Sequence, residues 1–90
     1  MDVDGTLKER GKEYGPYTSQ AAISQTLKRA ARACPNWPKL RSTHRESIDL
    51  ILMKLSRILN GNPDNLDSWT DIAGYATLAG RDAAKEPDVE

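Results

Sequence analysis

The amino-acid sequence predicts an all-α fold, a compact bundle of about four helices that is completed by oligomerisation. Apolar residues recur at helical spacing in four segments separated by proline and glycine, and no segment alternates apolar with polar residues as a half-buried strand does. The chain is also short. With 90 residues, 38% of them hydrophobic and 6% aromatic, it can bury only one small core. We therefore expect one helical domain over residues 1–84, followed by a disordered tail over residues 85–90.

The first two helices follow from their start and stop signals. A short helix is predicted over residues 4–14, where Gly15 and Pro16 stop it. The second helix starts with Thr18 or Ser19 as N-cap and runs to about residue 33. Its apolar stripe consists mostly of small residues, namely Ala22, Ile23, Leu27, Ala30, Ala31 and Cys34. We therefore expect this helix to pack closely against its neighbours and to bury a modest apolar area.

The third helix has the clearest periodicity. Thr43 and Glu46 have the spacing of a capping box, and an Asn-Gly pair ending at Gly61 closes the helix. Its main apolar stripe comprises Ile48, Ile51, Leu52, Leu55, Ile58 and Leu59. Leu50 and Met53 point to the opposite side, so the helix is apolar on two sides. Such a helix forms either the centre of the bundle or part of a subunit interface, and we expect another copy of the chain to cover its Leu50 and Met53 side.

The fourth helix begins after Pro63, with Asp64 or Asn65 as its N-cap. Its predicted packing face comprises Trp69, Ile72, Ala73, Ala76 and Gly80. The two glycines of this helix, Gly74 and Gly80, each cost about 1 kcal/mol of helix stability relative to alanine. Close contact with another helix is the usual reason for retaining glycine at such positions.

The balanced net charge hides an uneven distribution. Residues 1–45 carry nine cations and four acids, a charge of +5, and the rest of the chain carries −5. This division favours charge pairing within the molecule or between subunits, and it leaves a cationic patch for a phosphate group. It argues against a protein that coats duplex nucleic acid, because the acidic half repels a phosphate backbone.

The sequence also indicates the cellular compartment. The single Cys34 cannot form an intramolecular disulfide, which is typical of a reducing cytoplasm. The N-terminus is polar and acidic, unlike a secretory signal, and no apolar run approaches the roughly 20 residues that a membrane helix needs. We expect a cytoplasmic protein without a membrane partner.

The first candidate site is the turn between the first two helices, where two cations, two aromatic rings and two glycines meet. Its residues are Arg10, Gly11, Lys12, Tyr14, Gly15 and Tyr17. Arginine offers a forked donor, glycine lets backbone N–H groups approach a ligand, and tyrosine can stack on a base, so this turn can hold a phosphate or a nucleotide. The alternative is a helix stop with both tyrosines packed on the core.

A basic stretch forms the second candidate. Six cations lie without one acid between residues 28 and 45, with Trp37 and His44 among them. Such a surface suits a polyanion or a phosphate-bearing ligand. A cationic helix end also suits the helix dipole and needs no ligand.

Paired carboxylates form the third candidate. Glu9 and Glu13 are spaced i, i+4 on the first helix, as are Asp67 and Asp71 on the fourth. Two facing pairs can hold Mg²⁺ for phosphate chemistry. Alternatively, the aspartates are solvated or pair with the cations of residues 54–57. No other cofactor is expected, because a lone His44 and a lone cysteine provide neither a zinc site nor a nucleophilic pair, and no glycine-flanked serine elbow exists.

Two motifs carry a family resemblance over roughly residues 5–80. The sequence has Arg-Gly-x-x-Tyr-Gly at residues 10–15 and Asp-x-Trp-x-Asp-x-Ala-Gly-Tyr at residues 67–75, joined by the helical segment 53–58. In these motifs it resembles a family of small, mostly uncharacterised tailed-phage and prophage proteins. Its layout is more distantly similar to the all-α nucleotide pyrophosphohydrolases of the MazG type. Those enzymes carry a Glu-Glu-x-x-Glu helix and a later Glu-x-x-Asp, and neither is present in this sequence.

The resemblance implies a phage accessory protein that acts in the host cytoplasm on nucleotides or on host defences. Together with the incomplete metal and nucleophile sets, it favours binding over turnover. The leading hypothesis is therefore an oligomeric protein that sequesters a phosphate-bearing nucleotide, such as a host immune signal. Its expected ligand-site residues are Arg10, Gly11, Tyr14, Gly15, Tyr17, Lys54, Arg57, Asp67, Trp69, Asp71 and Tyr75.

The expected roles within this set differ. Arg10, Tyr14 and Tyr17 would contact base and phosphate, and residues 54 and 57 would join them if the subunit interface forms part of the pocket. The residues of the 67–75 motif would orient those cations and pack the site. Two alternatives stay open: a Mg²⁺-dependent pyrophosphohydrolase that uses the paired carboxylates, and an anti-CRISPR-like inhibitor that binds a host defence protein directly.

Overall fold

The computed structural model describes residues 2–85. Within this range the chain forms four α-helices and one short 3₁₀ helix, η1, and it contains no strand. The elements are α1 (Val3–Tyr14), α2 (Tyr17–Arg32), η1 (Trp37–Lys39), α3 (Ser42–Asn60) and α4 (Leu66–Ala83). The predicted all-α bundle is therefore confirmed. The predicted disordered tail, apart from Lys85, lies outside the described residues.

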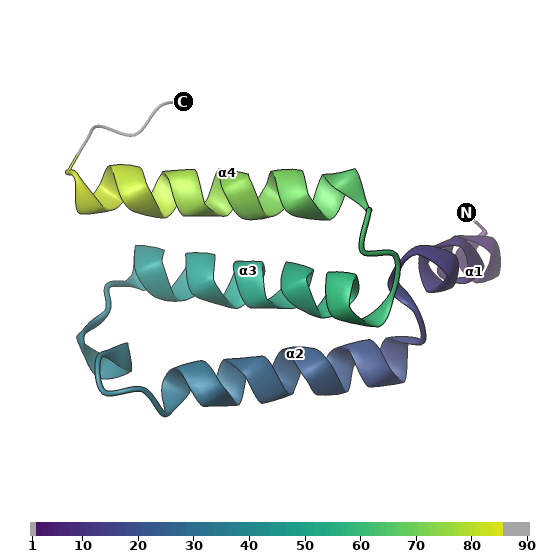
Figure 1. Ribbon diagram of the computed structural model, residues 1–90, viewed down its shortest axis with the longest axis horizontal. Helices are drawn as coiled ribbons and strands as arrows, with labels where there is room; N and C mark the ends of the chain where they lie inside the picture. The colour runs from purple at the N-terminus through teal and green to yellow at the C-terminus, as the bar shows by residue number, and fades with distance from the viewer. Residues whose placement is uncertain (1, 86–90) are drawn as a thin grey trace.

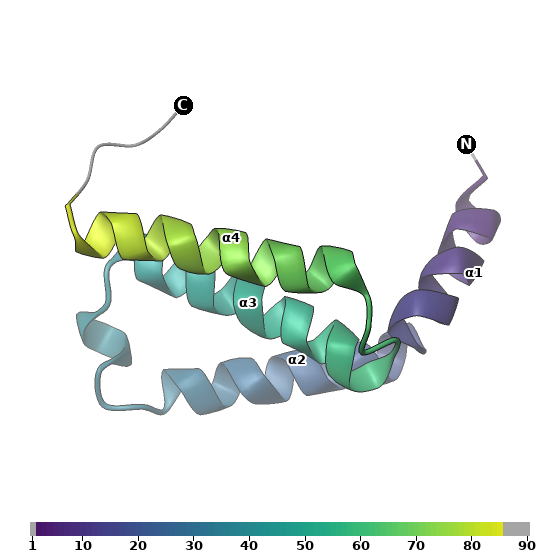
Figure 2. The same cartoon turned by 45° about the horizontal axis from the view of Figure 1, so that its top comes forward.

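Three of the helices form a single layer. Figure 1 shows α2, α3 and α4 side by side, with α3 in the centre and each neighbour antiparallel to it. The central position of α3 agrees with one of the two places predicted for a helix that is apolar on two sides. Helix α1 projects from one end of the layer as an arm (Figure 2), and none of its residues is buried.

The helix ends agree only partly with the predicted caps. Asn65 caps α4 as expected, and its side chain accepts a hydrogen bond from the backbone N–H of Ser68. The predicted Thr43 cap of α3 is wrong, because the N-cap is Arg41 and no side chain caps that end. The predicted cap of α2 at residue 18 or 19 is also wrong, since Pro16 holds that position. The fixed φ of proline starts the helix there without a side-chain acceptor.

The contacts between the helices are polar at their most buried points. The buried residues within the described range are Gln20, Ser24, Ser47, Ser56 and Ser68, and no hydrophobic side chain there is fully buried. Ser56 is 0% exposed, and its hydroxyl accepts a hydrogen bond of 2.7 Å from the side-chain amide of Gln20. Small serines let the helix axes approach closely, but they bury little apolar surface.

The face that α4 turns toward α3 differs from the prediction. Ser68 is buried and Tyr75 is half-buried, whereas Trp69, Ala73 and Ala76 of the predicted face are exposed. A Cβ atom added at Gly74 or Gly80 would meet nothing within 4 Å, so the close helix contact expected at these glycines does not occur among residues 2–85. The predicted face of α4 is wrong in part, because most of the apolar stripe of α4 lies beside its contact with α3 and not within it.

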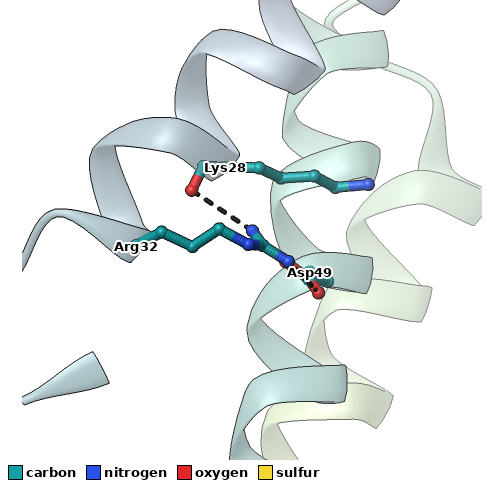
Figure 3. Close-up of polar contacts among 3 residues, drawn as sticks. All are labelled: Lys28, Arg32 and Asp49. Carbon is teal, nitrogen blue, oxygen red and sulfur yellow. Dashed lines mark hydrogen bonds and ion pairs between the residues drawn. The ribbon is translucent and has the colours of Figure 1, made fainter. Parts of the chain in front are cut away.

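Ion pairs join the basic and acidic halves of the chain. Arg32 on α2 reaches Asp49 on α3 with both terminal nitrogens, at 3.0 and 2.9 Å, and one of them also donates to the backbone carbonyl of Lys28 (Figure 3). The hydrogen bond to Asp49 raises the pKa of Arg32. Arg41 at the start of α3 pairs with Asp82 of α4 at 3.1 Å. These contacts occupy part of the basic stretch, and they are charge pairs within the molecule of the kind that the uneven charge distribution predicts.

None of the helices within residues 2–85 has both the length and the apolar character that crossing a membrane requires.

Candidate functional site

The arm α1 is anchored where its C-terminal end crosses the connection between α3 and α4. Gly15 has a φ of 76°, and the side-chain amide of Asn60 donates to the backbone carbonyls of Tyr14 at 2.8 Å and of Pro16 at 3.0 Å. A Cβ atom at Gly61 would overlap the backbone of Tyr14. Glycine is therefore needed at both positions. Gly15 adopts a positive φ, and Gly61 lets the two chain segments approach each other closely.

Glu13 completes this junction. Its carboxylate accepts hydrogen bonds from the side-chain amides of Asn65 at 2.9 Å and Asn62 at 3.3 Å. These bonds, first the one from Asn65, lower the pKa of Glu13 below its ordinary value of 4.5. The ionised glutamate therefore helps to fix α1 relative to the start of α4.

A cavity of about 490 Å³ lies between the anchored arm and the layer. Its lining comes from α1, the Gly15-Pro16 turn, α2 and one residue of α3: Leu7, Arg10, Gly11, Tyr14, Gly15, Pro16, Tyr17, Gln20 and Arg57. Such a volume falls within the usual range for small-molecule sites, about 300–1,000 Å³. The cavity therefore has room for a ligand of nucleotide size.

Arg57 is the most constrained cation of this cavity. Its guanidinium carbon lies 4.3 Å from the centroid of the Tyr14 ring, a cation–π contact that holds the group in place. Its Nε is buried and has no hydrogen-bond partner among residues 2–85. Within the same range, neither Arg57 nor Arg10 forms an ion pair. Two guanidinium groups therefore face the cavity without a carboxylate to neutralise them.

The start of α2 adds a further positive potential. Pro16 provides no capping side chain, and the first turn of α2 contains no acidic residue. The unpaired backbone N–H groups and the positive end of the helix dipole consequently lie at the cavity wall, where Pro16 and Tyr17 are located. Tyr17 is 81% exposed, so its ring is free to stack on a planar group.

Six of the predicted site residues meet in this cavity. They are Arg10, Gly11, Tyr14, Gly15, Tyr17 and Arg57. Sequence reasoning missed Leu7 and Gln20. Leu7 could have been identified from its helical spacing to residues 10, 11 and 14 on α1, whereas the place of Gln20 depends on how α2 packs against α3.

The remaining predicted residues lie elsewhere in the layer. Lys54 forms an ion pair of 2.8 Å with Asp71 between α3 and α4, so Asp71 orients Lys54 and does not orient Arg57. The indole N–H of Trp69 donates to the backbone carbonyl of Pro63 at 2.8 Å. Asp67, Trp69 and the half-buried Tyr75 all belong to α4 and are not among the lining residues.

The paired carboxylates do not form a common metal site. Residues 2–85 contain no group of three or more Asp, Glu, His or Cys side chains that could hold a metal ion. Glu13 is engaged by the two asparagines, and Asp71 is engaged by Lys54. The structure therefore does not bring Glu9, Glu13, Asp67 and Asp71, the ligand set of the enzyme alternative, together within the described residues.

Fold and site together define a small all-α protein with a cationic, tyrosine-lined cavity at a helix junction. A comparison with protein families matches residues 4–83 to a domain of unknown function, DUF6378. The match covers most of the chain, and the protein therefore belongs to the DUF6378 family. Searches of curated proteins and of solved structures found no match.

Proposed function

We propose that this protein binds a phosphate-bearing nucleotide in the cavity between α1 and the helix layer and holds it without turnover. The observation that carries the proposal is the pair of guanidinium groups, Arg10 and Arg57, which line the cavity without carboxylate partners among the described residues. A phosphate in the cavity would accept hydrogen bonds from the terminal guanidinium nitrogens of these two arginines and would supply the negative charge that they lack among the described residues.

The apolar part of the cavity supports a ligand with a planar group. Leu7 and the two tyrosines surround the cations, and tyrosine rings stack on nucleobases regardless of base type. A free inorganic phosphate would leave this apolar surface unused. The lining therefore favours a nucleotide over phosphate alone.

The lining also favours capture over catalysis. It contains no histidine, cysteine or carboxylate that could act as a base or a nucleophile toward a bound phosphate. In the phage setting that the motif resemblance implies, capture removes a signalling nucleotide from the host cytoplasm and so blunts a defence that depends on it.

The test is equilibrium dialysis of the full chain against a panel of mono-, di- and cyclic nucleotides, with and without Mg²⁺. The bound fraction is then denatured and analysed by chromatography. We expect at least one nucleotide to be retained and recovered unchanged. Recovery of new products contradicts the capture proposal, and no retention of any nucleotide contradicts the site as well.

Substitutions locate the binding site. Arg10→Ala and Arg57→Ala are each expected to weaken binding about 10- to 100-fold, because a hydrogen bond to a charged group contributes about 1.5–3 kcal/mol. Arg81→Ala is the matched control, since Arg81 is an exposed cation of α4 outside the cavity lining. Equal affinity of all three variants and the wild type would exclude this cavity as the site.

A further inference from the structure

The helix layer has one apolar face. On α3, Ser56 faces α2 and Lys54 faces α4, as their contacts with Gln20 and Asp71 show. The remaining two sides of α3 belong to the two faces of the layer. One of them carries a continuous stripe at i, i+4, i+7 and i+11 spacing, and this stripe contains no charge: Ile48, Leu52, Leu55 and Leu59.

The neighbouring helices extend this stripe. On α2, Ile23 and Leu27 lie on the side opposite the groove that Lys28 forms with Met53 and Arg57 of α3. On α4, Leu66 and Trp69 lie on the side opposite Asp71, and they are 74% and 48% exposed. We call the surface formed by these residues and the α3 stripe the apolar face.

The opposite face of the layer carries Leu50 and Met53, where the sequence predicts contact with a second copy, but it also carries charged side chains and is already partly covered. The cavity under α1 opens on that side, because Arg57 lines it together with residues of the arm. The ion pair between Lys54 and Asp71 and the groove beside Lys28 lie there as well. The arm therefore leaves the apolar face uncovered.

The exposed area exceeds that of a typical monomer. The protein exposes 6555 Å², whereas a folded monomer of its mass, 10.0 kDa, exposes about 5,200 Å². The excess of about 1,300 Å², to which the projecting arm also contributes, leaves room for the roughly 1,000 Å² that each partner buries in an obligate homodimer. Moreover, a domain needs two packed layers around an apolar core, and this chain provides one layer without a buried hydrophobic side chain in the described range.

We propose that the apolar face is the interface of a homodimer, in which a second copy of the chain supplies the missing layer. The same stripes face each other across a two-fold axis, and their side chains form the hydrophobic core that a single chain lacks. The uncharged stripe on α3 matches the depletion of charged residues at interface cores. The ligand cavities then lie on the two outer faces of the dimer, so ligand binding and dimerisation are separate properties.

The test is the mass in solution, measured by analytical ultracentrifugation, of the wild type and three variants. We expect a wild-type mass of twice the chain mass, and dissociation in Leu59→Glu and Leu66→Glu, whose leucines are exposed in the single chain. Leu78→Glu is the matched control, because Leu78 is also an exposed leucine, at 55% against 66% for Leu59 and 74% for Leu66, and it lies on the Asp71 side of α4. It is expected to leave the dimer intact.

A second measurement needs no variant. Because a dimer binds its own partner, the midpoint of thermal unfolding of the wild type is expected to rise with protein concentration. A monomeric wild type with a concentration-independent midpoint overturns the proposal, as does a dimer that Leu78→Glu dissociates and Leu59→Glu does not. A wild-type chain that stays monomeric but forms a complex with a different protein through Leu59 would likewise overturn it.

Discussion

Arg57 shows how one residue can be fixed by the fold and still be free to bind. The Tyr14 ring beneath its guanidinium restricts the side chain, while no acidic group of residues 2–85 neutralises it. A preorganised cation loses little conformational entropy when a ligand arrives. This combination distinguishes Arg57 from Arg32, whose guanidinium is engaged by Asp49.

At the same scale, Glu13 makes the anchoring of α1 dependent on pH. The pKa of Glu13 is lower in the folded state than its ordinary value of 4.5. Ionised Glu13 therefore stabilises the fold fully at pH values above 4.5, and this stabilisation is lost as the pH falls through the lower folded-state pKa. We expect the wild type to be more stable than Glu13→Gln at pH 7 and this difference to shrink below pH 4.5. Urea unfolding of both proteins at several pH values measures this difference in the free energy of unfolding.

Glu9→Gln is the control for this prediction. Glu9 lies one turn earlier on α1 and forms no hydrogen bond or ion pair within the described residues. Its substitution is expected to leave the pH dependence unchanged. If Glu9→Gln and Glu13→Gln alter the pH dependence equally, the asparagine contacts are not its cause.

At the scale of the elements, the attachment of α1 depends on close backbone contact at Gly61. A Cβ atom there would overlap the backbone of Glu13 and Tyr14, so Gly61→Ala is expected to lower the free energy of unfolding by about 1–3 kcal/mol. Gly74→Ala is the matched control, because its Cβ would meet nothing. Since alanine favours the helix, it should raise stability by about 0.5–1 kcal/mol. Chemical denaturation measures both, and a neutral Gly61→Ala would contradict the described junction.

The elements also show what the sequence can predict. Periodicity and the Gly15 and Pro16 stop were enough to locate all four helices and the cationic turn between α1 and α2, because these signals are local. The pairing of helix faces was not predictable in the same way. Burial of Ser68 in place of Trp69 depends on how α4 packs against α3, and hydrophobicity alone points to the tryptophan.

The candidate site likewise contains residues whose grouping the sequence predicts and residues whose grouping depends on helix packing. The residues of the 10–17 turn are neighbours in sequence, so their grouping could be predicted, and all of them except Lys12 and Glu13 line one cavity. Charge alone groups Lys54, Asp71 and Arg57. Residues 54 and 57 are neighbours on one side of α3, but Lys54 reaches across to Asp71 of α4, whereas the guanidinium of Arg57 lies over the Tyr14 ring of the arm, and these different partners depend on tertiary packing.

At the scale of the whole molecule, the layer is more extended than a closed domain. Its radius of gyration is 15.0 Å, compared with about 12 Å for a compact domain of 90 residues. The projecting arm accounts for part of this extension, and it is also what encloses the cavity. The arm α1 thus makes the molecule less spherical, encloses the cavity on one face of the layer and leaves the apolar face uncovered.

The most direct test of nucleotide capture is native mass spectrometry of the full chain and of Arg57→Ala, each incubated with the same nucleotide panel. We expect the wild type to carry one unchanged nucleotide per chain and Arg57→Ala to carry little or none, because the variant lacks the more constrained of the two cations that line the cavity without a carboxylate partner among the described residues. Absence of any nucleotide adduct on the wild type, or equal occupancy of the two proteins, would contradict this account of the site.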